Sequence, residues 1–440
     1  MGRDRDAAPR GLTRSIARIA ACLLVLGSAA LVAAGCGGSA DDANASGVPV
    51  IGFMTWRDQT GFDEKQFRKC EQASGGKYQI EAIPMGPSVD AAREQLSRRL
   101  AAGDETIDMI NLDVIWTAEF SDANWIMDLT ERVEPITDKF VPAPLESTRY
   151  KGKYWAVPAG TNAPVLYYRS DLVKEAPTTW EQMAEAAKAA QAKQPGVAGF
   201  VFQGAAYEGG TVDALEFMAG AGANILSEDG SKVVVGDGDG AKRAFTWLQQ
   251  LFDEKVTPKV VTTYMEEDAR LAFQKGDAVF MRNWPYAWAL MNQDEASKVK
   301  GKFDIAPLPG FEGQTPASTL GGKNYGIAAT TDEPELAWEA IMCLTSESVQ
   351  KEQAVVKGEM PTLKHLYDDA QLAKDVPFLD VLAKGLVTGK NRPTTPYYND
   401  LTIVIYQVYN DVLNGRISPE DAVEELQRKA QAAVDGKAEI

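Results

Sequence analysis

Apolar and polar positions along most of the chain follow two alternating periods. Runs typical of strands occupy residues 48–54, 78–83 and 106–112, and spacing typical of amphipathic helices occupies 63–73, 90–102 and 116–120. In the helix expected over 90–102, Leu96 and Leu100 lie four positions apart on one face, and arginines occupy the other. Strands that alternate with helices at this spacing predict a parallel α/β sheet.

The same alternation continues further along the chain. Strand-like runs occupy 153–158, 165–168, 199–202 and 278–281, and helical spacing occupies 180–192, 239–254 and 269–275. No repeat of about 20–50 residues is visible, which argues against a solenoid or a propeller. The 440 residues suffice for two or three domains with sizeable cores. The pattern therefore predicts an α/β protein with parallel-rich sheets and flanking helices.

The N-terminus has a different character. Five arginines precede the apolar run Ile19–Ala34, which ends at Gly35-Cys36. A basic leader, a short apolar stretch and small residues before a cleavage point are typical of an export signal. An uncleaved membrane anchor or an ordinary signal peptide has the same pattern, although a spanning helix needs ~20 apolar residues.

Residues 33–36 (AAGC) resemble a bacterial lipobox, in which the cysteine becomes the lipidated first residue of the mature protein. The resemblance implies a lipoprotein signal peptide over residues 1–35 and a palmitate-bearing lipid anchor on Cys36. It places the protein at the extracytoplasmic face of the cell membrane. Residues 36–47 (CGGSADDANASG) are small and polar, as expected of a flexible tether.

Charge and composition narrow the function classes. Acidic residues outnumber basic ones 62 to 45, and loss of residues 1–35 would leave 60 acidic and 40 basic side chains, a net charge of −20. A nucleic-acid binder needs a basic face, so this balance argues against one. His365 is the single histidine, which argues against histidine-based zinc sites and leaves one candidate base for a Ser-His-Asp triad. We expect neither a metal nor a cofactor.

Two cysteines remain once the N-terminal segment is set aside. Cys22 would leave with the signal and Cys36 would be lipidated, so Cys70 and Cys343 are left. An exported protein matures in an oxidising compartment, where such a pair can form a disulfide. Two buried free thiols are an equal alternative on the sequence alone.

Five blocks resemble, in order, those of family-one extracellular solute-binding proteins. They are Lys151–Arg169 (KGKYWAVPAGTNAPVLYYR), Pro177–Glu181 (PTTWE), Arg270–Pro285 (RLAFQKGDAVFMRNWP), Leu320–Ile327 (LGGKNYGI) and Leu413–Ala422 (LNGRISPEDA). Their order over nearly the whole mature chain, together with the lipobox, makes the resemblance specific. Within that family, residues 108–120 (DMINLDVIWTAEF) are most similar to the trehalose-binding lipoproteins of actinobacterial importers.

The resemblance implies two α/β lobes that are joined by crossing strands and close like a hinge on a sugar between them. The first lobe would hold residues 48–149 and 312–364, and the second would hold 150–311 and 365–440. Such a protein is a monomer and not an enzyme. It binds a neutral disaccharide or oligosaccharide, such as the α-linked disaccharide trehalose, and hands it to an ABC permease in the membrane.

The candidate ligand residues are polar or aromatic side chains at the ends of predicted strands. Carboxylates and amides accept hydrogen bonds from sugar hydroxyls, charged acceptors make the stronger bonds, and indole rings offer flat apolar platforms. With the resemblance taken into account, the candidates are Asp58, Gln59, Asp113, Asn162, Glu266, Glu267, Trp284, Gly322 and Arg392. Glu266 and Glu267 are alternatives for one role, and spacing does not choose between them.

These candidates have structural alternatives. Asp113 ends a parallel strand, where open α/β sheets bind ligands, but the spacing also suits a helix N-cap. Asn162 is equally suited to a turn and Trp284 to a core. Gly322 could turn the chain, and Arg392 could form a surface ion pair.

A secreted glycoside hydrolase is the rival class, because it also needs paired carboxylates and aromatic side chains. With 60 acidic residues some pair is inevitable, and no pair stands out. An adhesion or scaffold lipoprotein is a third class, but it would not need Asp, Asn and Trp at loop positions after successive strands.

Overall fold

The computed structural model describes residues 47–58, 60–227 and 230–438, so the expected signal peptide, Cys36 and Gln59 lie outside the described residues. A first sheet has the strand order β2-β1-β3-β12-β6. Its strands are β1 (Val50–Thr55), β2 (Gln79–Pro84), β3 (Met109–Asp113), β6 (Val157–Asn162) and β12 (Gly321–Ile327). As the alternating pattern predicts, β1 is parallel to β2 and β3, whereas β12 runs antiparallel to β3 and β6.

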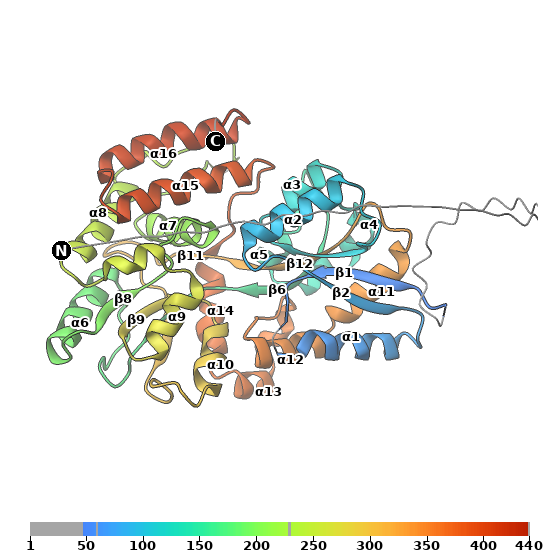
Figure 1. The fold of residues 1–440 in the computed structure, drawn as a ribbon, viewed down its shortest axis with the longest axis horizontal. Helices are drawn as coiled ribbons and strands as arrows, with labels where there is room; N and C mark the ends of the chain where they lie inside the picture. The colour runs from blue at the N-terminus through green and yellow to red at the C-terminus, as the bar shows by residue number, and fades with distance from the viewer. Residues whose placement is uncertain (1–46, 59, 228–229, 439–440) are drawn as a thin grey trace, which may run out of the picture. The chain divides into compact units, whose positions relative to one another are not determined.

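Helices cover both faces of this sheet (Figure 1). On one face lie α1 (Phe62–Ala73), α11 (Pro334–Leu344) and α12 (Glu347–Lys357), and on the other lie α2 (Val89–Ala101) and α3 (Thr117–Asp122). Successive side chains of a strand point to opposite faces. In β1, Ile51 and Phe53 therefore pack into the core that contains Phe67, while Met54 packs into the core that contains Leu96. This sheet with its helices is the first lobe.

The second lobe is built on a sheet with the strand order β10-β7-β9-β8. Its strands are β7 (Val165–Tyr168), β8 (Ala198–Val201), β9 (Ala278–Asn283) and β10 (Asp304–Pro307). Among the described strands of this sheet, β8 and β9 pair in parallel and the other two pairs are antiparallel. This sheet is therefore mixed, and not parallel-rich as the sequence pattern predicts. Its helices are α6 (Trp180–Lys193), α7 (Glu208–Gly220), α8 (Gly240–Asp253), α9 (Glu266–Gln274), α10 (Tyr286–Gln293), α14 (Leu379–Thr388), α15 (Tyr398–Leu413) and α16 (Pro419–Val434).

Within the described residues, the chain passes between the two sheets three times. It leaves the first sheet after Asn162, returns through β11 (Ser318–Thr319) into β12, and leaves again between α12 and α14. The short strand β13 (Gly389–Lys390) follows α14 and pairs in parallel with β11. Because β6 pairs with β12, residues 157–162 belong to the first sheet, although the sequence analysis placed residues from 150 onward in the second lobe.

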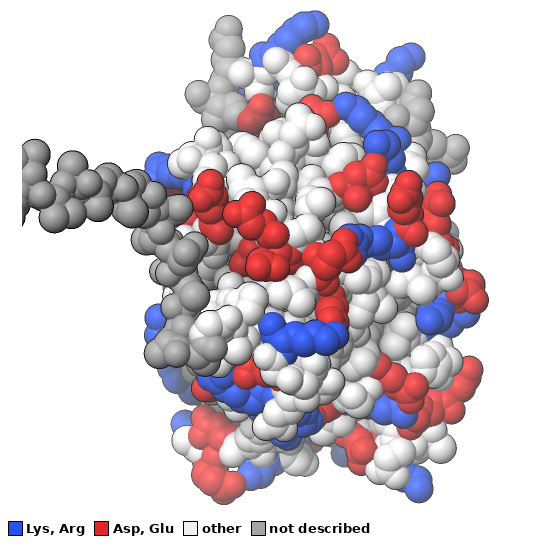
Figure 2. All heavy atoms as spheres, turned by 90° about the vertical axis from the view of Figure 1, so that its right-hand side faces the viewer, with Lys and Arg blue, Asp and Glu red and all other residues white. Residues whose placement is uncertain are grey.

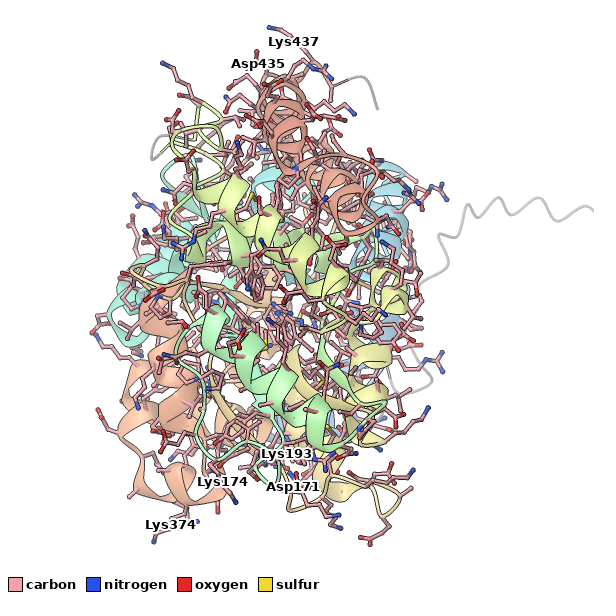
Figure 3. All side chains as sticks on the ribbon, turned by 90° about the vertical axis from the view of Figure 1, so that its left-hand side faces the viewer. Asp171, Lys174, Lys193, Lys374, Asp435 and Lys437 are labelled. Carbon is pink, nitrogen blue, oxygen red and sulfur yellow. A yellow bond between two sulfur atoms is a disulfide. The ribbon has the colours of Figure 1, made fainter. Side chains whose placement is uncertain are left out.

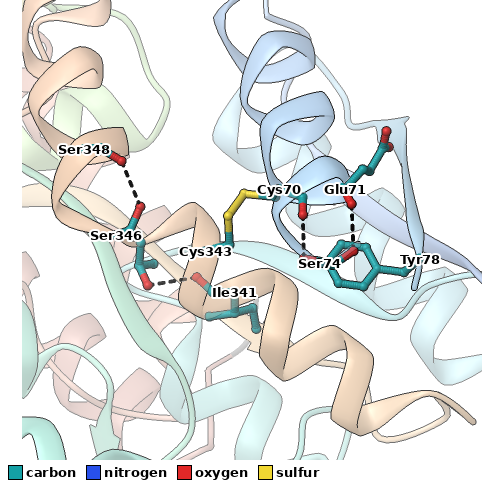
Figure 4. Close-up of a disulfide and its surroundings, with 9 residues drawn as sticks. Cys70, Glu71, Ser74, Tyr78, Ile341, Cys343, Ser346 and Ser348 are labelled. Carbon is teal, nitrogen blue, oxygen red and sulfur yellow. Dashed lines mark hydrogen bonds between the residues drawn. A yellow bond between two sulfur atoms is a disulfide. The ribbon is translucent and has the colours of Figure 1, made fainter. Parts of the chain in front are cut away.

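A disulfide joins Cys70 of α1 to Cys343 of α11, with 5.8 Å between the two Cα atoms (Figure 4). The two cysteines are 273 positions apart in the sequence. Cys70 is fully buried, and its carbonyl oxygen accepts a hydrogen bond from the Ser74 N–H (2.9 Å). Of the two alternatives left open by the sequence, the structure has the bridge, and it ties the returning segment to the first lobe.

The surface is rich in charge. Acidic side chains gather across the middle of the exposed first-lobe face (Figure 2). On the second lobe, charged side chains such as Lys193 at the end of α6 and Lys437 beyond α16 extend outward (Figure 3). Among the residues with described positions, none of the helices is long and apolar enough to cross a membrane. In that same part of the chain, no group of His, Cys, Asp and Glu could hold a metal ion.

Candidate functional site

The first-lobe candidates share one edge of the first sheet. Asp113 ends β3 and Asn162 ends β6. Because β12 is antiparallel to both strands, its first residues reach the same edge, and Gly321 lies beside Asn162 in register. The sequence rule that polar residues after parallel strands collect at one edge therefore applies to this pair.

Arg392 connects this edge to the second lobe. Its Nη2 lies 3.0 Å from Asp113 Oδ1, and its Nη1 lies 2.6 Å from the Oε1 of Glu208, the first residue of α7. The side chains of Arg392 and Glu208 are 4% and 3% exposed, so this is a buried ion pair and the surface alternative for Arg392 is wrong. A buried guanidinium needs such compensation, because desolvating a charge is costly.

Glu208 is surrounded by donors. Tyr398 donates its hydroxyl to Oε1 at 2.7 Å, and Thr402 donates its hydroxyl to Oε2 at 2.5 Å. Burial raises the pKa of Glu208 above its ordinary value, against the opposing charge of Arg392. The ring of Tyr398 packs into the first-lobe core although its helix belongs to the second lobe. Glu208 and Tyr398 thus link the two lobes beside Asp113.

Asp113 does not cap a helix. The N-cap position of α3 is Trp116, and Asp113 Oδ1 instead accepts a hydrogen bond from the Ile115 N–H within its own turn (3.2 Å). Its side chain is 13% exposed. The turn and Arg392 therefore both hold the carboxylate through Oδ1.

Trp284 follows β9 and reaches the first-lobe edge. Its ring is half-buried, and an added Cβ at Gly321 would lie 2.9 Å from the ring carbon Cη2. On one face of the ring lies the guanidinium of Arg282, with its Cζ 4.7 Å from the ring centroid. Beside Gly321, Asn162 has a buried Oδ1 that has no hydrogen-bond partner within the described residues. Trp284 and Asn162 are thus brought to one place by different lobes.

The two adjacent glutamates have different surroundings. Glu266 Oε2 accepts a hydrogen bond from the Tyr207 hydroxyl (2.7 Å). The Glu266 carbonyl accepts one from Asn283 Nδ2 (2.9 Å), and Asn283 Oδ1 in turn accepts the Trp284 N–H (2.8 Å). Glu267 is instead held by Arg270 at the helix surface. Glu267 also accepts a hydrogen bond from the Tyr286 hydroxyl (2.7 Å). Asn283 thus links the backbone of Glu266 to that of Trp284.

Asp58 and Gly322 are explained largely by local structure. Asp58 accepts hydrogen bonds from the N–H groups of Thr60 (3.0 Å) and Asp63 (2.9 Å), so its carboxylate orders the loop after β1. Gly322 has φ +142°, and an added Cβ would lie 2.3 Å from the Gly160 carbonyl oxygen. Only glycine tolerates that approach between β6 and β12.

Comparison with known proteins gives the family. Residues 62–351 match the family described as bacterial extracellular solute-binding protein. The chain belongs to this family. This solute-binding protein is also 33% identical over 380 residues to a probable ABC transporter-binding protein of Deinococcus radiodurans, and the match covers 83% of this chain and 89% of that protein.

Solved structures agree with the fold of this solute-binding protein. Maltose-bound MalE3 of T. maritima is 36% identical with a TM-score of 0.81, over 87% of this chain and 99% of that chain. The GacH receptor of Streptomyces glaucescens GLA.O shares the fold at 20% identity, with a TM-score of 0.80 over 88% of this chain and 99% of that one. The expected two-lobe α/β fold is confirmed. The family and the relative are named as binding proteins, which favours solute binding over a glycoside hydrolase.

Sequence reasoning missed several residues of this site. Tyr207 and Glu208 follow the strand-like run at 199–202, so the rule that selected Asp113 would have selected them too. Arg282 and Asn283 lie inside the recognised block Arg270–Pro285, but an arginine in a strand carries no local signal that it is buried.

Proposed function

We propose that this protein captures a neutral α-linked disaccharide, such as trehalose or maltose, between its two lobes and delivers it to an ABC permease. The observation that carries the proposal is the grouping of Asp113, Asn162 and Trp284 at strand ends of both lobes. A charged acceptor, a neutral acceptor and an aromatic platform are the groups that suit a ring of hydroxyls with apolar C–H faces.

Two oxygen atoms at this place are available to a sugar. Asn162 Oδ1 is buried without a hydrogen-bond partner, and within the described residues no donor reaches Asp113 Oδ2. A buried acceptor without a donor is costly, and a sugar hydroxyl would satisfy it. Arg392 holds Asp113 through Oδ1 only, which supports a role in orienting the carboxylate toward a solute.

The likeness to MalE3 supports the substrate class. That protein was solved with maltose bound, and the match spans almost all of it at 36% identity. Trehalose stays a prediction from the sequence resemblance. Glu266 is the better candidate of the two adjacent glutamates, because Asn283 holds its backbone beside Trp284.

Delivery from a membrane anchor is part of the proposal. The lipobox at residues 33–36 supports lipidation of Cys36, and the Gly/Ser/Asp-rich segment 36–47 supports a tether between the anchor and the lobes. The family is described as extracellular, which supports solute binding outside the cytoplasm. The permease would receive the sugar from a monomeric binding protein.

Thermal melting and calorimetric titration with trehalose and maltose test the proposal. A bound sugar raises the melting temperature through linkage, and a dissociation constant near micromolar corresponds to about −8 kcal/mol. Because the solute is neutral, its affinity should be almost the same at low and at molar salt despite the acidic protein.

The outcomes separate the alternatives. If millimolar trehalose and millimolar maltose both leave the melting temperature unchanged, the disaccharide proposal is wrong. A steep dependence of affinity on salt would mean that the solute is charged. Release of glucose from either sugar by the pure protein would identify a glycoside hydrolase instead.

A further inference from the structure

Arg282 is a fully buried arginine that lies against the proposed sugar platform. It stands on β9, and Trp284 follows two positions later, directly after the strand ends at Asn283. Its guanidinium covers one face of the Trp284 ring, with 4.7 Å from Cζ to the ring centroid. The exposed fraction of the Arg282 side chain is 0%. A solute can therefore stack only on the opposite face of the ring.

Three side chains hold the guanidinium in place. Glu216 of α7 accepts from Nε at 2.8 Å and from Nη2 at 2.5 Å. Gln203 accepts from Nη1 at 2.8 Å, and Asp213 Oδ1 lies 3.1 Å from Nε. This bidentate geometry orients the plane of the guanidinium as well as its charge.

The same cluster reaches the crossing strand behind the ring. The Thr319 N–H of β11 points to Glu216 Oε1 at 3.4 Å. Two residues further along, the backbone of Gly321 lies against the edge of the Trp284 ring. The ring is thus bounded by Arg282 on one face and by Gly321 at its edge. Glu216 contacts Arg282 directly and the backbone of Thr319, two residues before Gly321.

Stability alone does not account for this cluster. One guanidinium is buried with two carboxylates, Asp213 and Glu216, both of which have pKa values raised by burial. Buried ion clusters often contribute little to stability, because the cost of desolvation offsets the attraction, and apolar residues of similar volume serve as well. A cluster that is unfavourable to build and touches a proposed binding residue points to a role at the site.

We propose that Arg282, held by Asp213 and Glu216, is a positioning residue that sets the plane of Trp284 and leaves one ring face for a single sugar ring. The sugar-binding part of this inference rests on the proposed function. The effect of Arg282 on the position of the Trp284 ring does not. A direct measurement of the ring and a binding measurement can therefore fail independently.

Fluorine NMR of the full chain with 5-fluorotryptophan reads the ring directly. The Trp284 resonance is the one missing in Trp284→Phe.

Removing Arg282 alone would leave two buried carboxylates without a partner, so the test variant combines Arg282→Met, Asp213→Asn and Glu216→Gln. We expect this neutral variant to shift or broaden the Trp284 resonance without any sugar present. Arg282→Lys, which keeps the charge but loses the planar fork, should give a smaller shift. An unchanged resonance in the neutral variant overturns the proposal.

A binding cycle with trehalose and maltose tests the consequence. The neutral variant should bind about tenfold more weakly than the wild type, but the same substitutions should change affinity less than about twofold when Trp284 is already alanine. Equal losses in both backgrounds would mean that Arg282 does not act through Trp284. Failure of the wild type to bind either sugar would contradict the proposed function. The NMR result would still test the positioning role of Arg282, because it needs no sugar.

Two further variants guard against a folding artefact. Gly321→Ala would place a methyl group 2.9 Å from the ring and should move the Trp284 resonance with the ion cluster intact. Arg169 and Asp171 form another bidentate pair in the second lobe, with both bonds at 2.7 Å. Arg169→Met with Asp171→Asn should leave the Trp284 resonance and sugar affinity unchanged. A shift in this control equal to that in the neutral variant would overturn the proposal.

Discussion

Arg392 and Asp113 form an ion pair with 3.0 Å between Nη2 and Oδ1, although they lie 279 positions apart in the chain. Asp113 ends a strand of the first lobe, and Arg392 stands on the segment between β13 and α15 of the second. The pair therefore joins the lobes at the place where a sugar is proposed to bind. The same guanidinium has a second carboxylate partner, Glu208, at 2.6 Å from Nη1.

Asp113→Asn should weaken sugar binding by about tenfold to a hundredfold, or roughly 1–3 kcal/mol. The substitution keeps the shape but replaces one acceptor oxygen by a donor, which leaves a sugar hydroxyl mispaired and weakens the contact with Arg392. Calorimetric titration measures the loss. Asp128→Asn, which removes an exposed ion pair of the first lobe, serves as the control and should leave affinity unchanged. Unchanged affinity in Asp113→Asn would move the site elsewhere.

Trp284→Ala should lower sugar affinity by a similar amount, because the stacking platform is lost. The change in intrinsic fluorescence on sugar addition should become smaller as well. Trp338→Ala is the matched control, since that ring also lies under an arginine, Arg132, but on α11. Equal affinity losses in the two variants would point to general destabilisation and not to a platform.

The disulfide should stabilise the fold without affecting the site. Replacing Cys70 and Cys343 together by serine should lower the free energy of unfolding by about 2–4 kcal/mol, because the bridge restricts the unfolded chain. Urea titration measures this, and sugar affinity should stay within about twofold of the wild type. If two thiols react with a thiol reagent in denatured, unreduced protein that begins after Cys36, the bridge is absent in solution.

Acid should remove one identifiable part of the stability. Glu352 of α12 is bonded to Lys65 and Lys69 of α1, and these bonds lower its pKa from 4.5 to about 2. A carboxylate with a lowered pKa stabilises the folded state at pH values above its ordinary pKa of 4.5. That contribution disappears as the pH falls toward 2. The wild type should therefore be more stable than Glu352→Gln at pH 7, and the difference should vanish between about pH 4.5 and pH 2.

Urea titrations over this pH range provide the check. Glu94→Gln removes an exposed pair with Arg98 on α2 and should cost at most about 0.5 kcal/mol at any pH. A difference between wild type and Glu352→Gln that stays constant down to pH 2 would contradict the assigned pKa.

Local pattern was enough for much of the fold. The strand expected over 48–54 is β1 at Val50–Thr55, and the helix expected over 90–102 is α2 at Val89–Ala101. Both follow from periodicity, which depends on near neighbours in the chain. The position of Asp113 at the end of a buried strand was predictable for the same reason.

Long-range pairing was not predictable in this way. Arg392 stands in a segment, NRPTTP, that has the composition of a solvated loop, and only the packing of α15 against the first lobe buries it between Asp113 and Glu208. The proposed preference for Glu266 over Glu267 likewise rests on Asn283, which belongs to another element.

The sequence by itself determined the alternation of strands and helices, the acidic charge and the family resemblance, because each of these depends on the order of neighbouring residues or on composition. Only the tertiary structure decided that Cys70 meets Cys343 and that Arg282 lies beneath Trp284. Pairings across such distances depend on how whole elements pack, and packing is settled by the shapes and charges of many surfaces at once.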